Sequence, residues 1–152
     1  MKGVGEDFRT LFKKLYFMCL PNCRLRSKYI ETHKSEFGHI GKNIKWQPRK
    51  FPADPEMLFF GDNVKLSSDI VFINHDVLDE MLNCREDVTE KFKHKTGRIY
   101  IGNNVLLGTG VKVMPDVHIG NNCVVAAGAI VTKDVPDNSV VGGGSGKIYN
   151  EF

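Results

Sequence analysis

The sequence of 152 residues has no apolar run approaching the roughly 20 residues that a membrane-spanning helix needs. Its 21 basic and 18 acidic residues nearly balance, and a net charge of +3 is too small to indicate nucleic-acid binding. Four cysteines (Cys19, Cys23, Cys84 and Cys123) have neither the density of a disulfide framework nor the paired spacing of a zinc site. The N-terminal residues also lack the apolar core of a secretory signal. These absences favour a soluble, cytoplasmic, single-domain protein.

What the sequence does contain is a six-residue repeat. From residue 101 onward, every sixth position is aliphatic: Ile101, Leu107, Val113, Ile119, Val125 and Val131. Four positions after each of these stands a small or β-branched apolar residue: Val105, Val111, Val117, Cys123, Ala129 and Val135. This period matches neither a helix nor the alternation of a long strand. It is typical of a left-handed parallel β-helix, in which three short strands form each triangular coil and the coils stack.

A longer motif marks the starts of coils: Ile40-Gly-Lys-Asn-Ile, Phe60-Gly-Asp-Asn-Val, Ile101-Gly-Asn-Asn-Val and Ile119-Gly-Asn-Asn-Cys. The spacings between these starts are 20, 41 and 18 residues. The middle spacing exceeds one coil by 23 residues and predicts an inserted loop at about 78–100, a length typical of functional loops. We therefore predict a mainly β fold of about four coils over residues 40–141.

The segments flanking the coils are predicted to cover their ends. Glu6 to Leu20 reads as an amphipathic helix, Pro21-Asn22 breaks it, and a second, basic helix is predicted from Arg24 to about Ser35. Because a solenoid needs its open strand edges covered, we favour a helical cap over residues 1–39. Membrane contact through the basic first helix is the alternative that we do not favour. Residues 142–152 form a short C-terminal tail.

These motifs resemble those of the hexapeptide-repeat acyltransferases, particularly the branch that O-acetylates sugars, capsular polysaccharides and lipopolysaccharides. The segment from Phe60 to Asp76, ending Phe-Ile-Asn-His-Asp, is similar to a signature of that branch, in which a His-Asp pair ends a coil before a protruding loop. Val125 to Pro136 resembles the closing segment of the family. The resemblance implies a homotrimeric, acetyl-CoA-dependent O-acetyltransferase with active sites between neighbouring subunits. It also implies a sugar hydroxyl as acceptor, in capsular or cell-envelope polysaccharide synthesis.

His75 is the predicted general base that takes the proton of the attacking hydroxyl. It is the one histidine of five that stands where a coil meets the loop and that carries the motif. Asp76 could position His75, contact the acceptor or merely form a corner, although adjacent side chains on a strand point to opposite faces. Asn74 is a weaker candidate for substrate binding. The charged loop is the predicted acceptor surface, with a solvated loop that has no acceptor role as the alternative. Its aromatic Phe92 could equally be a platform for a sugar ring or a residue that anchors the fold.

By the same resemblance, coenzyme A is expected to contact Thr109, Ala127, Thr132, Lys133 and Lys147. Small neighbouring residues would let the ligand approach the backbone, and the lysines would supply charge for its phosphates. The chain departs from the family after the closing segment. Ser145 stands where the family has a proline, so we expect a more flexible C-terminal end.

Other classes built on this fold fit less well. A γ-class carbonic anhydrase needs several histidines converging on zinc, whereas His75 and His118 lie 43 positions apart without close partners, so no metal is expected. The 39 residues before the first coil are too few for the nucleotide domain of a nucleotidyltransferase. The alternatives that stay open are a serine or antibiotic O-acetyltransferase and a non-catalytic trimeric scaffold.

Overall fold

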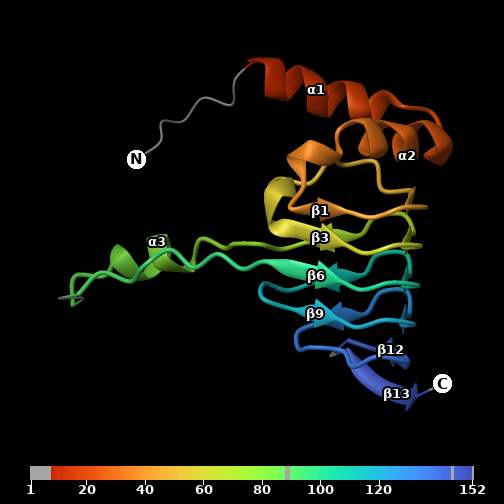
Figure 1. The fold of residues 1–152 in the computed structure, drawn as a ribbon. Coiled ribbons are helices and arrows are strands. Elements are labelled where there is room, and N and C mark those ends of the chain that lie inside the picture. Colours follow the sequence, from red (N-terminus) through yellow and green to blue (C-terminus); the bar gives the residue numbers. More distant parts are fainter. Residues whose placement is uncertain (1–7, 88–89, 145, 152) are drawn as a thin grey trace.

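The chain winds into a three-sided prism, with two helices across one end, a hairpin at the other and a long loop projecting sideways (Figure 1). The computed structural model describes residues 8–87, 90–144 and 146–151. Sheet A contains β1 (His39–Ile40), β3 (Leu58–Phe60), β6 (Ile99–Ile101) and β9 (His118–Ile119). Sheet B contains β2 (Lys45–Trp46), β4 (Lys65–Leu66), β7 (Leu106–Leu107), β10 (Val124–Val125), β12 (Ser139–Gly142) and β13 (Lys147–Glu151). Sheet C contains β5 (Val71–Phe72), β8 (Lys112–Val113) and β11 (Ile130–Val131).

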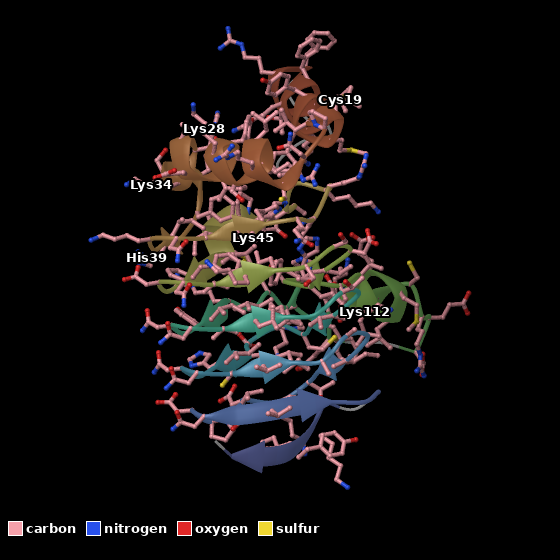
Figure 2. All side chains as sticks on the ribbon, turned by 90° about the vertical axis from the view of Figure 1, so that its right-hand side faces the viewer. Cys19, Lys28, Lys34, His39, Lys45 and Lys112 are labelled. Atoms are coloured by element: carbon pink, nitrogen blue, oxygen red, sulfur yellow. The ribbon has the colours of Figure 1, made fainter. Side chains whose placement is uncertain are left out.

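Successive coils place one strand in each sheet, and every strand pair is parallel except β12 with β13. The prediction of a parallel β-helix is therefore confirmed. Figure 2 looks onto sheet B, with His39 of sheet A and Lys112 of sheet C at its opposite sides. The six aliphatic hexad residues and the six smaller ones that follow them are all buried, so the repeat predicts the interior correctly.

The Gly and Asn residues of the longer motif allow neighbouring coils to pack closely and to bond to one another. A Cβ added to Gly102 would lie 2.7 Å from the carbonyl oxygen of Gly120 in the next coil, so no larger residue fits without a shift. Five asparagines of this edge have positive φ: Asn43, Asn63, Asn104, Asn122 and Asn138. Each of the first four donates from its side-chain amide to the side-chain oxygen of the next one along the edge, at 2.8 to 3.0 Å. Asparagine suits both the left-handed backbone and this ladder.

Two helices cover the N-terminal end. The first, α1 (Phe8–Cys19), ends close to the expected Leu20, while the expected start at Glu6 lies outside the described residues. The second, α2 (Cys23–Thr32), is capped by Asn22, whose side chain accepts from the Leu25 amide at 3.0 Å. It contacts β2, where the Ser27 hydroxyl accepts the Trp46 amide at 2.8 Å. Short 3-10 turns follow at Lys34–Glu36 and Pro55–Met57.

The first helix contributes to this cap through a small part of its apolar surface. Phe17 is the buried residue of α1, whereas its other large apolar side chains are exposed. The main capping contacts come from α2, because α2 lies between α1 and the first coil (Figure 1).

The loop and the C-terminal end contain structure that the repeat does not reveal. Between β5 and β6 the chain leaves the prism and forms the short helix α3 (Leu78–Asn83). At the C-terminal end, where a flexible tail was expected, β13 pairs antiparallel with β12 and lies along the last coil. Ser145, to which that expectation referred, lies outside the described residues. In the part of the chain that the structure describes, no helix is long and apolar enough to cross a membrane.

The two neighbouring leucines of β7 test which position of the hexad places its side chain inside the prism. Leu107 is fully buried and Leu106 is 41% exposed, so Leu107→Ala should lower the free energy of unfolding by about 2–5 kcal/mol. Leu106→Ala is the matched control, with an expected loss of less than about 1 kcal/mol. Denaturant unfolding of both variants measures the difference. Equal losses would mean that β7 does not present Leu107 to the interior.

Candidate active site

His75 lies at the base of the projecting loop, on the prism edge that follows sheet C. It forms an antiparallel bridge with Thr96 of the returning arm. One residue earlier, Asn74 accepts the Gly97 amide at its carbonyl (2.7 Å) and donates from its side-chain amide to the Gly97 carbonyl (2.9 Å). A Cβ on Gly97 would lie 2.6 Å from the backbone nitrogen of Asp116, so the returning arm packs directly on the next coil. The backbone around His75 is therefore held from both sides.

An aspartate from the preceding coil contacts the His75 ring. Asp54 Oδ2 lies 2.9 Å from His75 Nδ1, and the two side chains are 27% and 41% exposed. Asp54 precedes the 3-10 turn Pro55–Met57, and its carboxylate makes no capping bond to that turn. A carboxylate at Nδ1 selects the tautomer that carries its proton there, which leaves Nε2 as a proton acceptor. This arrangement is suited to general-base chemistry.

The two neighbours of His75 in the motif have contacts within the chain. Asp76 Oδ1 accepts the Leu78 amide at 3.0 Å, which places this carboxylate at the start of α3. Its side chain is exposed. Asn74 is 3% exposed, and its amide is bonded to Gly97. Asp76 therefore stands at the corner where the loop begins, and Asp54 is the carboxylate that pairs with His75.

The two arms of the loop are joined by side-chain bonds beyond the His75–Thr96 bridge. Asn83 accepts the Phe92 amide at 2.8 Å and donates to the Phe92 carbonyl at 2.9 Å. Closer to the base, His94 Nδ1 lies 3.0 Å from Asp79 Oδ1. The ring centroids of His94 and His75 are 5.6 Å apart. A second His–Asp pair thus stands beside the first.

Hydrogen bonding between His94 and Asp79 shifts both pKa values. This hydrogen bond raises the pKa of His94 above 6.5 and lowers the pKa of Asp79 below 3.8. Both shifts favour the charged forms, so the pair is ionised between the two pKa values. The charged pair strengthens the link between the arms of the loop.

The residues expected to contact coenzyme A lie on two different edges of the prism. Phe72, Val113 and Val131 are in register across sheet C, so the residues that follow them share one edge. That edge carries His75, Thr132 and Lys133. Thr109 and Ala127 follow sheet B on the next edge, where the Gly128 amide donates to the Thr109 carbonyl at 2.8 Å. A single chain therefore separates these residues into two groups.

Lys147 belongs to the C-terminal hairpin, and the preceding Gly146 packs against Ile130 and Val131 of β11. Lys147 is part of β13 at the C-terminal end, opposite Gly142 of β12. Its Nζ lies 5.8 Å from the centroid of the Tyr149 ring. All five residues expected to contact coenzyme A have exposed side chains, so each is accessible to a ligand.

Sheet A carries a row of aromatic side chains on its outer face. Phe59 stacks on Tyr100 with centroids 4.5 Å apart, and Tyr100 meets the His118 ring edge-on, also at 4.5 Å. These rings line a hollow of about 510 Å³, with His39 at one end and Asp134 at the other. Among residues 8–87, 90–144 and 146–151, no three His, Cys, Asp or Glu side chains converge as a metal site would require.

Sequence reasoning missed Asp54, the His94–Asp79 pair and the aromatic row. Asp54 lies 21 positions before His75 in a segment without hexad order, and no local pattern connects the two. The aromatic row had a detectable signal, because Phe59, Tyr100 and His118 each precede the first residue of a coil motif. Side chains at that position alternate with the buried one and point outward.

Comparison with known proteins gives relatives over most of the chain. The family described as bacterial transferase hexapeptide (six repeats) matches residues 98–133. Protein CapG of Staphylococcus aureus is 39% identical over 139 residues, which span 91% of this chain and 76% of that protein. Galactoside O-acetyltransferase of Escherichia coli (strain K12) is 33% identical over 154 residues, spanning 97% of this chain and 70% of that protein.

Solved structures share the fold at lower identity. A maltose O-acetyltransferase from Clostridium difficile 630 superposes with a TM-score of 0.63 at 20% identity, covering 96% of this chain and 89% of that one. A galactoside acetyltransferase in complex with coenzyme A superposes with a TM-score of 0.59 at 22% identity, covering 97% and 84%. The fold of these structures is the left-handed parallel β-helix that the hexad predicts.

The His94–Asp79 pair makes the order of the loop depend on pH. Because the pKa of His94 is raised, its charge contributes fully below 6.5 and is lost as the pH rises through the raised value. The Asp79 contribution is present above 3.8 and is lost below that value. Proteolysis of the loop should therefore become faster as the pH rises from below 6.5 through the raised pKa of His94. His94→Gln removes the titrating group and should flatten this dependence. An unchanged pH dependence in that variant would assign it to another group.

Proposed function

The chain belongs to the hexapeptide-repeat O-acetyltransferases, and on that premise we propose that it transfers an acetyl group from acetyl-CoA to a hydroxyl of a saccharide. The observation that carries this proposal is the His75–Asp54 pair at the base of the loop. The Nδ1–Oδ2 distance of 2.9 Å holds the ring in one tautomer, and the 41% exposure of His75 leaves the ring accessible to an acceptor. A base of this kind is what acetyl transfer to a hydroxyl requires.

In the proposed reaction, His75 Nε2 accepts the proton of the acceptor hydroxyl as its oxygen attacks the thioester carbonyl. A carbon–oxygen bond forms and the carbon–sulfur bond breaks, so the acetyl group passes directly to the acceptor. The protonated ring is stabilised by the Asp54 carboxylate and returns its proton to the departing thiolate of coenzyme A. Asp54 acts as a positioning residue because it contacts His75 and not the reacting atoms.

Coenzyme A is proposed to extend along the edge that carries His75. Thr132 and Lys133 lie on this edge two coils from His75, which corresponds to about 10 Å at the spacing of stacked strands. The thioester would lie near His75 and the phosphates near Lys133. Lys147, at the C-terminal end, is the second proposed phosphate contact.

Thr109 and Ala127 join this site only if two chains contribute to it. They lie on the other edge of sheet C, so a groove between neighbouring prisms could bring this edge of one chain against the His75 edge of the next. A three-sided prism can close such contacts under threefold symmetry. We therefore propose a homotrimer with three equivalent clefts.

The projecting loop is the proposed acceptor surface. Phe92 is 51% exposed, while its backbone is held by Asn83, so the ring is presented on an ordered arm. Together with Leu78 and Leu82 it lines a small hollow of about 120 Å³ near Asp76 and Asp79. An exposed ring among carboxylates and lysines suits a sugar, which has apolar faces and many hydroxyls. The Phe60-to-Asp76 motif supports the polysaccharide branch, so a capsular or cell-envelope saccharide is the proposed acceptor.

Substitutions at the His–Asp pair test the mechanism. His75→Ala should lower kcat by about 10² to 10⁴, because a general base acts in the transition state. Asp54→Asn should lower kcat by roughly 10²-fold through misplacement of the ring, and Asp54→Glu should recover part of the loss. Steady-state acetyl transfer to a panel of nucleotide-sugars, oligosaccharides and serine measures both.

Coenzyme affinity is the control for these variants. Calorimetric titration with acetyl-CoA should give the same Kd for His75→Ala, Asp54→Asn and the parent protein. Near-normal turnover of His75→Ala would exclude it as the base, and lost coenzyme binding would assign it a structural role. A strong preference for serine in the panel would overturn the saccharide assignment.

The ring of Phe92 is the most specific test of the acceptor surface. Phe92→Ala should raise the acceptor KM by about tenfold, since stacking on an aromatic ring is worth about 0.5–1.5 kcal/mol beyond burial. The KM for acetyl-CoA should not change. Phe92→Leu is the matched control, because it keeps an apolar side chain but removes the flat ring. An acceptor KM that is unaffected in both variants would exclude the loop from acceptor binding.

A further inference from the structure

The outer side of α1 is an exposed apolar surface that the proposed acetyl transfer does not use. Six of its side chains are between 43% and 75% exposed: Phe8, Leu11, Phe12, Leu15, Tyr16 and Met18. The first five follow the spacing of one face of a helix, so they form a continuous stripe. We call these six residues the α1 stripe. Figure 1 shows α1 lying across the end of the prism, with α2 between it and the coils.

The α1 stripe points outward because the opposite side of the helix is anchored. Phe17 is fully buried, and its ring meets Tyr29 and Phe51 edge-on, at 5.2 and 5.3 Å between centroids. Lys13 forms an ion pair with Glu36 and lies 5.6 Å from the centroid of the Phe51 ring. These contacts fix the rotation of α1 about its axis, and with it the direction of the stripe.

Every charged side chain of α1 is basic. Arg9, Lys13 and Lys14 lie between the α1 stripe and the anchored side, as successive 100° steps along a helix require. Over residues 8–32, which include α2, there are six basic residues and one acidic residue. Figure 2 shows Lys28 at the same end of the molecule as Cys19, the last residue of α1. An apolar stripe flanked by positive charge matches a surface whose interior is apolar and whose headgroups are anionic.

The length of α1 determines whether the helix could span a membrane or would lie flat on its surface. Its 12 residues span about 18 Å, which is too short to cross a hydrocarbon layer of about 30 Å. A helix that lies flat buries its apolar stripe below the headgroups while its basic side chains reach up to them.

We propose that α1 docks this protein onto an anionic membrane surface, with the α1 stripe inserted and the basic side chains of Arg9 and Lys14, which flank the stripe, at headgroup level. The prism then stands end-on, with the C-terminal hairpin β12–β13 farthest from the membrane (Figure 1). The loop with α3 projects from the side of the prism, so docking leaves it accessible. This proposal does not depend on acetyl transfer.

Vesicle flotation of the full chain tests the proposal. The protein should float with vesicles of phosphatidylcholine and phosphatidylglycerol, but only weakly with phosphatidylcholine alone. Binding should weaken in about 0.5 M salt, where charges are strongly screened. Phe12→Gln combined with Leu15→Gln should lower the partition coefficient by about tenfold or more, because two large apolar side chains no longer leave water. Thr10→Gln is the matched control on the exposed, polar part of the same helix and should bind like the parent.

Mass in solution and thermal melting complete the test. Phe12 and Leu15 are exposed, so the double variant should keep the melting temperature and the oligomeric mass of the parent. A lower mass in that variant would show that a second copy of this chain covers the α1 stripe, which would overturn the proposal. Failure of the parent to float with anionic vesicles, or equal binding by the double variant, would overturn it as well.

Discussion

A coil of this prism cannot bury its own interior, and the strands, each of two to five residues, pair with strands of the neighbouring coils. The spacing between coils is therefore the constraint on which the other features depend. Gly102 is needed because the next backbone approaches too closely for a side chain, and the asparagine ladder joins one coil to the next at 2.8 to 3.0 Å. The same constraint requires covers at both ends, which α2 and β13 provide.

Stacking also makes room for the loop that carries the candidate site. β3 pairs with β6 and β5 pairs with β8, so the coils before and after the insertion remain in register. The chain can leave the prism at this edge without losing strand pairing. Outside the prism, the described arms of the loop are joined by the His75–Thr96 bridge and by the side-chain bonds of Asn74, Asp79 and Asn83. His75 stands where the two kinds of support meet, which gives a reactive side chain a rigid base.

The aromatic row on sheet A and the α1 stripe are both exposed, but they are attached to the rest of the protein in different ways. The aromatic row on sheet A belongs to the strands, so its rings stack at the spacing of the coils. The α1 stripe belongs to a helix that contacts the prism through Phe17 and Lys13 and has no strand pairing of its own. One end of the prism thus carries an apolar surface with basic flanks, while the candidate active site lies at the side of the prism.

The hexad by itself determined the buried interior, because the positions of Leu107 and its equivalents depend only on a local period that repeats with each coil. The motif also predicted the loop and made His75 the candidate base, and strand alternation is consistent with the pairing of His75 with Asp54 and not with its neighbour Asp76. Only the tertiary structure decided that Asp54 is that partner, since the contact depends on the path of an irregular segment with no period to read. The direction of the α1 stripe was likewise decided by tertiary contacts. An amphipathic pattern predicts that a helix has an apolar face. The contacts of Phe17 determine which side of the helix packs against the rest of the protein.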